Sequence, residues 1–76
     1  MLPTTIGTTL YIENGYFNAV TTAQIVRVTK TAVVCDDGRR YAIATGRAAH
    51  GWEAAPMTDA KREILARRAA ARAARR

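Results

Sequence analysis

Apolar and polar side chains alternate with a short period over residues 8–55, a pattern that predicts β-strands. The stretch TTLYIENGYF, residues 8–17, places Leu10 and Ile12 on one face and leads into Asn14-Gly15. An Asn-Gly pair between β-forming residues predicts a hairpin turn, since both residue types accept positive φ. The next residues, 18–22, are less regular, and we expect a loop there.

The stretch AQIVRVTKTAVVCDDGRRYAIAT, residues 23–45, contains three short apolar runs. Val26 and Val28 alternate with polar residues, as in a half-buried strand. Residues 36–38, Asp-Asp-Gly, predict a turn in which Gly38 is left-handed. Tightly joined strands of this kind predict an antiparallel meander. The predicted core residues are Leu10, Ile12, Val26, Val28, Val34, Tyr41 and Ile43.

Residues 59 to about 72 predict a helix. Thr58 is a plausible N-cap, Asp59 suits the first turn, and no Gly or Pro follows. At 100° per residue, the helix carries a basic stripe beside an alanine face. We expect Ile64 and Leu65 to dock on the sheet, while Arg68, Arg72 and Arg75 of the stripe face solvent. The last two turns have only alanine to bury, so we expect them to stand free and fray.

The whole chain has 76 residues, enough for one small domain with little stability to spare. The pattern divides it into a β-rich part, residues 1–56, and a basic C-terminal helix, residues 57–76. Residues 1–56 carry five basic and four acidic side chains, whereas residues 57–76 carry seven basic and two acidic ones. A near-neutral body with a cationic end predicts an anionic partner for that end.

Several classes of function are disfavoured by composition. One cysteine and one histidine cannot form a disulfide or a zinc site unaided, so we expect no cofactor and no metal. Asp36 and Asp37 are interpreted as solvated turn residues rather than an acid–base pair, and Cys35 as a core thiol. His50 is expected to be an exposed loop residue. The protein is therefore predicted not to be an enzyme.

The five aromatic residues have two interpretations. A small β-fold needs aromatic side chains inside, which is the default for Trp52, Tyr11 and Tyr41. Exposed aromatics could instead stack on bases, as they do in oligonucleotide-binding barrels. Tyr16 and Phe17, beside the predicted hairpin turn, are the best candidates for that role.

Residues 24–76 resemble a group of small phage and prophage proteins. Their pattern is V-x-K-V-T-K-T-x-V, then D/N-G-x-R-[FY], a Gly-Arg loop, a Trp, a short Pro-Thr segment and an Arg-rich C-terminal helix. The matching positions are Val26, Val28, Thr29, Lys30, Thr31, Val33, Asp37, Gly38, Arg40, Tyr41, Gly46, Arg47, Trp52, Pro56 and Thr58. The resemblance implies a mainly β fold, a small SH3-like barrel with a C-terminal α-helix, but no particular activity.

This chain departs from that pattern in its charges. Arg27 stands where the pattern often has lysine, and Ala42 and Ala44 stand where it is often basic. Positive charge is thus shifted from the third strand to the C-terminal helix. A phosphate site on the helix is therefore favoured over one on the barrel.

We expect a non-enzymatic binding module that contacts nucleic-acid phosphates without reading bases. The alternatives are a modulator that binds an acidic surface of a host protein, and a self-assembling structural component. A membrane partner is disfavoured, because the helix has little apolar surface and the sequence has no apolar run of spanning length. With no signal peptide, the chain is expected in the cytoplasm, of an infected bacterial host if it is phage-encoded. The candidate contact residues are Lys61, Arg68, Arg72, Arg75 and Arg76 on the helix, and Arg27, Lys30, Arg39 and Arg40 on the barrel.

Overall fold

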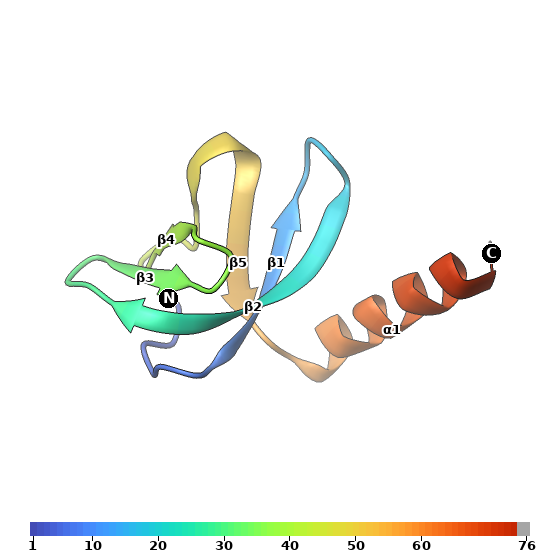
Figure 1. Ribbon diagram of the computed structural model, residues 1–76, viewed down its shortest axis with the longest axis horizontal. Helices are drawn as coiled ribbons and strands as arrows, with labels where there is room; N and C mark the ends of the chain where they lie inside the picture. Colours follow the sequence, from blue (N-terminus) through green and yellow to red (C-terminus); the bar gives the residue numbers. More distant parts are fainter. Residues whose placement is uncertain (75–76) are drawn as a thin grey trace.

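The computed structural model describes residues 1–74 and shows five antiparallel strands followed by one helix (Figure 1). The sheet order is β4-β3-β2-β1-β5, so each strand pairs with its chain neighbour except β5, which returns beside β1. The elements are β1 (Thr9–Asn14), β2 (Ala19–Val28), β3 (Ala32–Cys35), β4 (Arg40–Ala42), η1 (Ala49–Gly51), β5 (Trp52–Pro56) and α1 (Asp59–Ala74). The predicted mainly β fold with a C-terminal helix is confirmed.

The sheet curls into a half-barrel because β2 is long enough to serve two partners. Its first half pairs with β1 and its second half with β3. Between β4 and β5 the chain at 46–48 bridges the remaining gap, as Ala42 N donates to Arg47 O and Ala54 N donates to Gly46 O. Gly46 has φ +76, and a Cβ there would collide with the Ala54 carbonyl oxygen. Only glycine therefore fits where the two edges meet.

Side chains from all five strands form one buried core. Leu10, Ile12 and Tyr41 are fully buried, as predicted, and Val28 and Ile43 pack against them partly buried. Two predicted core positions are wrong. Val26 is 51% exposed and Val34 is only half-buried, while their neighbours occupy the core. The remaining buried members are Leu2, Ala23, Ile25, Val33, Cys35 and Ala54.

A β-bulge in β2 explains the error at Val26. Ile25 pairs with Cys35, but the next pair in the ladder is Arg27 with Val34. The extra residue puts both Val26 and Arg27 outside, and it returns Val28 to the inner side. Strict alternation, which treats Val26 and Val28 as one face, fails across a bulge.

The β1–β2 hairpin is present, but its turn differs from the predicted one. The connection is four residues long, 15–18, and its positive φ falls at Asn18 (φ 50) rather than at Asn14 or Gly15. Asn14 is buried, and its Oδ1 accepts hydrogen bonds from the backbone N of Tyr16 (2.9 Å) and Phe17 (3.4 Å). The loop expected over 18–22 is wrong from residue 19 onward, because β2 begins at Ala19.

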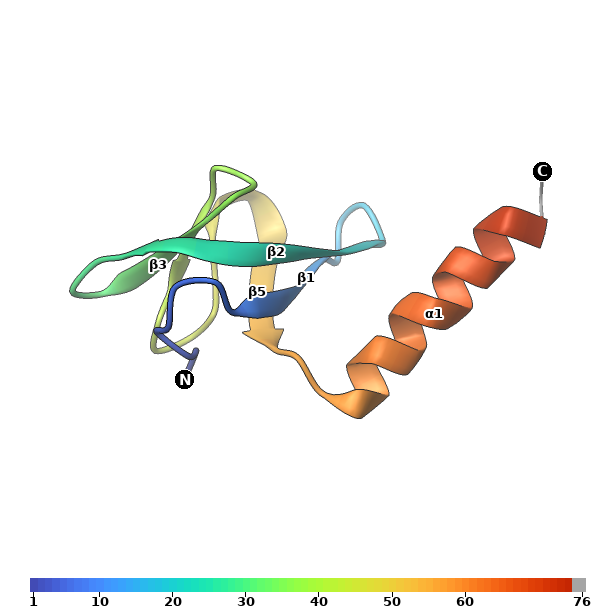
Figure 2. The same cartoon turned by 60° about the horizontal axis from the view of Figure 1, so that its bottom comes forward.

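Helix α1 begins as predicted and extends away from the half-barrel (Figure 2). Lys61 N donates to Thr58 Oγ1 at 3.2 Å, which makes Thr58 the N-cap. None of its residues is buried, so the expected docking of Ile64, which is 41% exposed, is wrong; Leu65 is half-buried. The helix continues to Ala74. Of the described segments, no helix is long and apolar enough to cross a membrane.

Candidate nucleic-acid interface

The helix approaches the half-barrel at the β1–β2 hairpin, where a groove of about 290 Å³ separates α1 from β2. Arg68 spans this groove at its end: Nη1 donates to Asn18 O and Nη2 donates to Asn18 Oδ1, both at 3.1 Å. We call this the hairpin groove. Its lining residues are Val20, Thr21, Thr22, Leu65, Arg68, Ala69 and Arg72.

The predicted basic stripe lies on the side of α1 that faces the hairpin. Lys61 Nζ lies 5.3 Å from the ring centroid of Tyr11, and Arg68 is held by Asn18. Arg72, one turn beyond Arg68, is exposed and lines the same groove. Arg68 and Arg72 are exposed, as expected, whereas Lys61 is half-buried. Arg75 and Arg76 lie outside the described residues.

Acidic side chains neutralise other cations on the helix. Arg67 Nη2 pairs with Glu63 Oε1 at 2.6 Å, and Arg62 Nη1 lies 3.5 Å from Asp59 Oδ1. Within residues 1–74, Arg68 and Arg72 have no acidic partner of this kind. The positive potential of the described helix is thus concentrated at the hairpin groove.

A second hollow, the barrel cleft, lies between the β3–β4 hairpin and the connection from β4 to β5. It has a volume of about 670 Å³, large enough for a small-molecule ligand. Small side chains make up much of its surface, with cationic and aromatic groups among them. The lining residues are Thr31, Ala32, Arg39, Arg40, Ala42, Arg47, Ala48, Ala49, His50 and Trp52.

Arg39 is held in place within the barrel cleft. Its Cζ lies 3.8 Å from the ring centroid of Trp52, a close cation–π contact, and its Nη1 lies 3.3 Å from Asp37 Oδ2. The Asp37 carboxylate also accepts hydrogen bonds from Arg39 N (2.9 Å) and from the hydroxyl of Tyr41 (2.7 Å). Two effects raise the pKa of the Tyr41 hydroxyl: burial is the larger, and the hydrogen bond to Asp37 is the second. The hydroxyl therefore keeps its proton.

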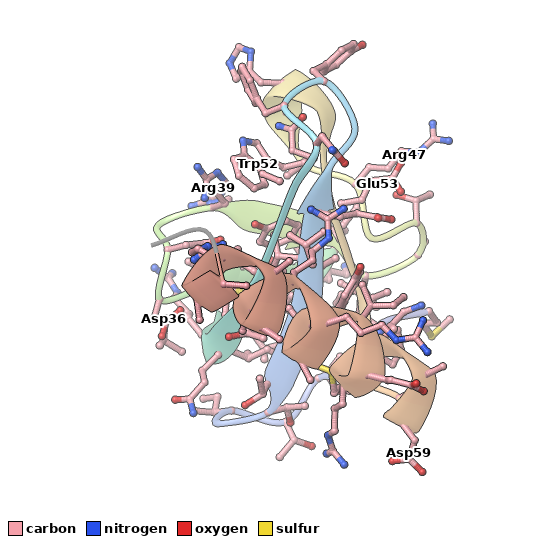
Figure 3. All side chains as sticks on the ribbon, turned by 90° about the vertical axis from the view of Figure 1, so that its right-hand side faces the viewer. Asp36, Arg39, Arg47, Trp52, Glu53 and Asp59 are labelled. Carbon is pink, nitrogen blue, oxygen red and sulfur yellow. The ribbon has the colours of Figure 1, made fainter. Side chains whose placement is uncertain are left out.

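The predicted barrel cations do not form a single site. Arg39 and Arg40 line the barrel cleft, whereas Arg27 lies on the outer face of β2 and Lys30 is exposed in the β2–β3 turn. Arg47 also lines the cleft, but its side chain pairs with Glu53 at 3.7 Å. Figure 3 shows Arg39 beside Trp52 on one side of the half-barrel and Arg47 beside Glu53 on the other.

Sequence reasoning missed Trp52 and His50 as cleft residues. Trp52 is expected in the core; it begins β5, and its half-buried side chain packs against the core while it also lines the cleft. His50 is exposed, as expected, with φ 62 inside η1. The sequence signals that point to this region are the predicted contact residues Arg39 and Arg40, together with Arg47 and Trp52 of the sequence pattern.

The tip of the β1–β2 hairpin lies between the hairpin groove and the barrel cleft. Tyr16 is 83% exposed and Phe17 is 72% exposed, in agreement with the prediction that these aromatics could be available for stacking. A Cβ on Gly51 would overlap the Tyr16 ring, so that ring lies directly against the residue that precedes Trp52. Asn14 Nδ2 donates to His50 O at 2.9 Å and fixes the same junction. We call Arg72, Arg68, Phe17, Tyr16, Trp52, Arg39 and Arg40 together the cationic–aromatic band.

The remaining candidate chemistry serves the fold. Burial, with Asp37 and Asp36 adding to it, raises the pKa of the Cys35 thiol to about 11, so the thiol stays protonated. Asp36 Oδ1 accepts a hydrogen bond from Gln24 N at 3.1 Å and ties the turn to β2. Over residues 1–74, no three metal-ligating side chains gather at one point.

Comparison of the chain with protein-family models, with curated proteins and with solved structures finds no match.

Proposed function

We propose that this protein is a non-enzymatic nucleic-acid-binding module that grips the phosphate backbone. The observation that carries the proposal is the cationic–aromatic band. Its exposed aromatic rings, Tyr16 and Phe17, lie between Arg68 and Arg72 of the helix, which have no acidic partner within residues 1–74, and the arginines of the barrel cleft. Positive groups along a groove neutralise phosphates, and aromatic rings accept bases of any sequence. The formal net charge of +6 gives the same chain a long-range attraction to polyanions.

In this proposal Arg68 and Arg72 are the principal phosphate contacts of the helix. They are one helical turn apart on the hairpin side of α1, so a single backbone can reach both. Arg68 is already oriented by Asn18, which lowers the entropy that it loses when it binds. Lys61 and the barrel cations Arg27 and Lys30 add charge at greater distance.

The test is the salt dependence of binding to random-sequence duplex DNA, measured by fluorescence anisotropy. Each lost phosphate contact lowers the slope of log Kobs against log salt by about 0.9. We expect the double variant Arg68→Gln/Arg72→Gln to flatten the slope by roughly two units and to weaken binding equally for different sequences. The matched control is Arg62→Gln/Arg67→Gln, which removes the same charge from two arginines that pair with Asp59 and Glu63, and we expect it to leave the slope nearly unchanged.

One outcome would overturn the proposed function, and another would move the phosphate site from the helix to the barrel. If the wild type binds no DNA or RNA at low salt, the nucleic-acid function is wrong. Capture of one acidic protein from nuclease-treated lysate would then favour a modulator of that protein, and a discrete high-mass species in light scattering would favour self-assembly. If DNA binds but the double variant keeps the full slope, the phosphates lie on the barrel near Arg27, Lys30, Arg39 and Arg40.

A further inference from the structure

The barrel cleft contains a planar cationic group, the Arg39 guanidinium, which has no part in the phosphate contacts proposed for the helix. Trp52 covers one face of the Arg39 guanidinium, yet the side chain remains 37% exposed and lines the cleft. The exposed part of the guanidinium is therefore accessible to a ligand in the cleft. A guanidinium plane of this kind is one of the two surfaces, with aromatic rings, on which proteins stack unpaired bases.

Two neighbours keep this plane in position before any ligand arrives. Asp37 holds Arg39 through both its backbone N and its Nη1, and the buried Tyr41 hydroxyl holds Asp37 in turn. Trp52 is itself fixed by the pairing of β5 with β1. Because the side chain is already ordered, a ligand that stacks on it loses little affinity to side-chain entropy.

The other cleft groups suit one nucleotide. Arg40 is exposed at the wall and makes no ion pair within the described chain, so it is available for a phosphate. Ala32, Ala42 and Ala48 leave space for a planar ring. A duplex keeps both faces of each base inside its stack, so only an unpaired nucleotide can enter such a site.

We propose that the barrel cleft binds one unpaired nucleotide of a nucleic-acid strand, with its base stacked on Arg39 and its phosphate facing Arg40. This inference rests on the proposed function and adds a selectivity: the cleft takes only an unpaired nucleotide, whereas the helix arginines contact the phosphates of single and double strands alike. The exposed Tyr16 and Phe17 extend the stacking surface from the cleft toward the hairpin groove.

The first measurement is the fluorescence emission of Trp52. It needs no variant, because Trp52 is the only tryptophan of the sequence and its emission reports on the cleft. We expect a single-stranded oligonucleotide of mixed sequence to change the Trp52 emission of the full chain, and a duplex of equal charge to leave it nearly unchanged. A nucleoside monophosphate serves as the third arm. If it produces the same emission change at equally low concentration, the cleft recognises a free nucleotide and the strand proposal is wrong.

The second measurement distinguishes the contribution of the planar guanidinium of Arg39 to binding from the contribution of its positive charge. Arg39→Lys keeps the charge but removes the stacking plane. We expect it to weaken binding of the single strand by about tenfold, within the range of one lost stacking contact, while duplex affinity changes by less than twofold. Arg62→Lys, at an exposed helix position paired with Asp59, is the matched control and should change neither. Circular dichroism establishes that both variants fold.

The two proposals fail in different ways. If the wild type binds single and double strands alike, and Arg39→Lys weakens neither selectively, the cleft inference is wrong while the phosphate-binding function stands. If the chain binds neither at low salt, the underlying function is wrong as well.

Discussion

Asp37 shows how much one residue can organise beyond what its local sequence suggests. Residues 36–38 correctly predict the turn, and Gly38 has φ +81. Asp37, however, is not the solvated side chain that such a turn suggests. It is half-buried and bonds to both Arg39 and Tyr41. Its role depends on where those two side chains point, which a turn motif does not specify.

At this scale we predict the effect of Tyr41→Phe. The change removes the hydroxyl that donates to Asp37 but keeps the buried ring, so it isolates one hydrogen bond to a charged group. Such bonds are worth about 1.5–3 kcal/mol, and we expect a loss of unfolding free energy near the lower end, because Asp37 retains Arg39. Urea denaturation measures the loss. Tyr16→Phe, at an exposed ring, should stay within about 0.5 kcal/mol of the wild type; equal effects in the two variants would contradict the assigned bond.

At the scale of the element, the bulge in β2 decides which side chains are inside. Ile25 is buried and Val26 is exposed, although both are β-branched and the sequence favours Val26 for the core. We predict that Ile25→Asp unfolds the protein, because it buries a charge without a partner in a small domain. Val26→Asp should change the free energy of unfolding by less than about 1 kcal/mol.

Circular dichroism and urea denaturation of the two aspartate variants give a direct comparison of adjacent residues. A folded Ile25→Asp protein, or an unfolded Val26→Asp protein, would place the bulge elsewhere in the strand. Val28→Asp is expected to be intermediate, because Val28 is only partly buried.

The positions of the strands and the helix along the chain were largely predictable. Which side chains of β2 point into the core was not. Alternating residues predicted strands in the regions of β1, β2 and β4, a short apolar run predicted β3, and Thr58 identified the start of α1. The bulge has no signal in the sequence, since it arises from the pairing of Ile25 and Arg27 with a second strand. The candidate site was harder still. Arg39 and Arg40 were recognised as cations, but their proximity to Trp52 depends on the return of β5 beside β1.

At the scale of the whole molecule, the half-barrel and the helix are nearly independent in their packing. No residue of α1 is buried. We therefore predict that a chain truncated after Met57 loses the helical dichroism signal yet keeps a β spectrum and a Tm within a few degrees of the full chain. A truncated chain that does not fold would show that the helix contributes to the core.

The Arg68–Asn18 contact couples the attachment of α1 to the binding of an anion. A guanidinium carries five N–H donors, and Asn18 takes two of them, so three remain for an incoming anion. A phosphate and the hairpin can thus share the same arginine, and each partner helps to keep its side chain oriented for the other. By thermodynamic reciprocity, whatever strengthens the attachment of the helix to the hairpin strengthens the hold on the anion by the same factor. An anion bound at Arg68 would thus also tighten the attachment of α1 to the β1–β2 hairpin, so that one arginine couples the position of the helix to the occupancy of the groove.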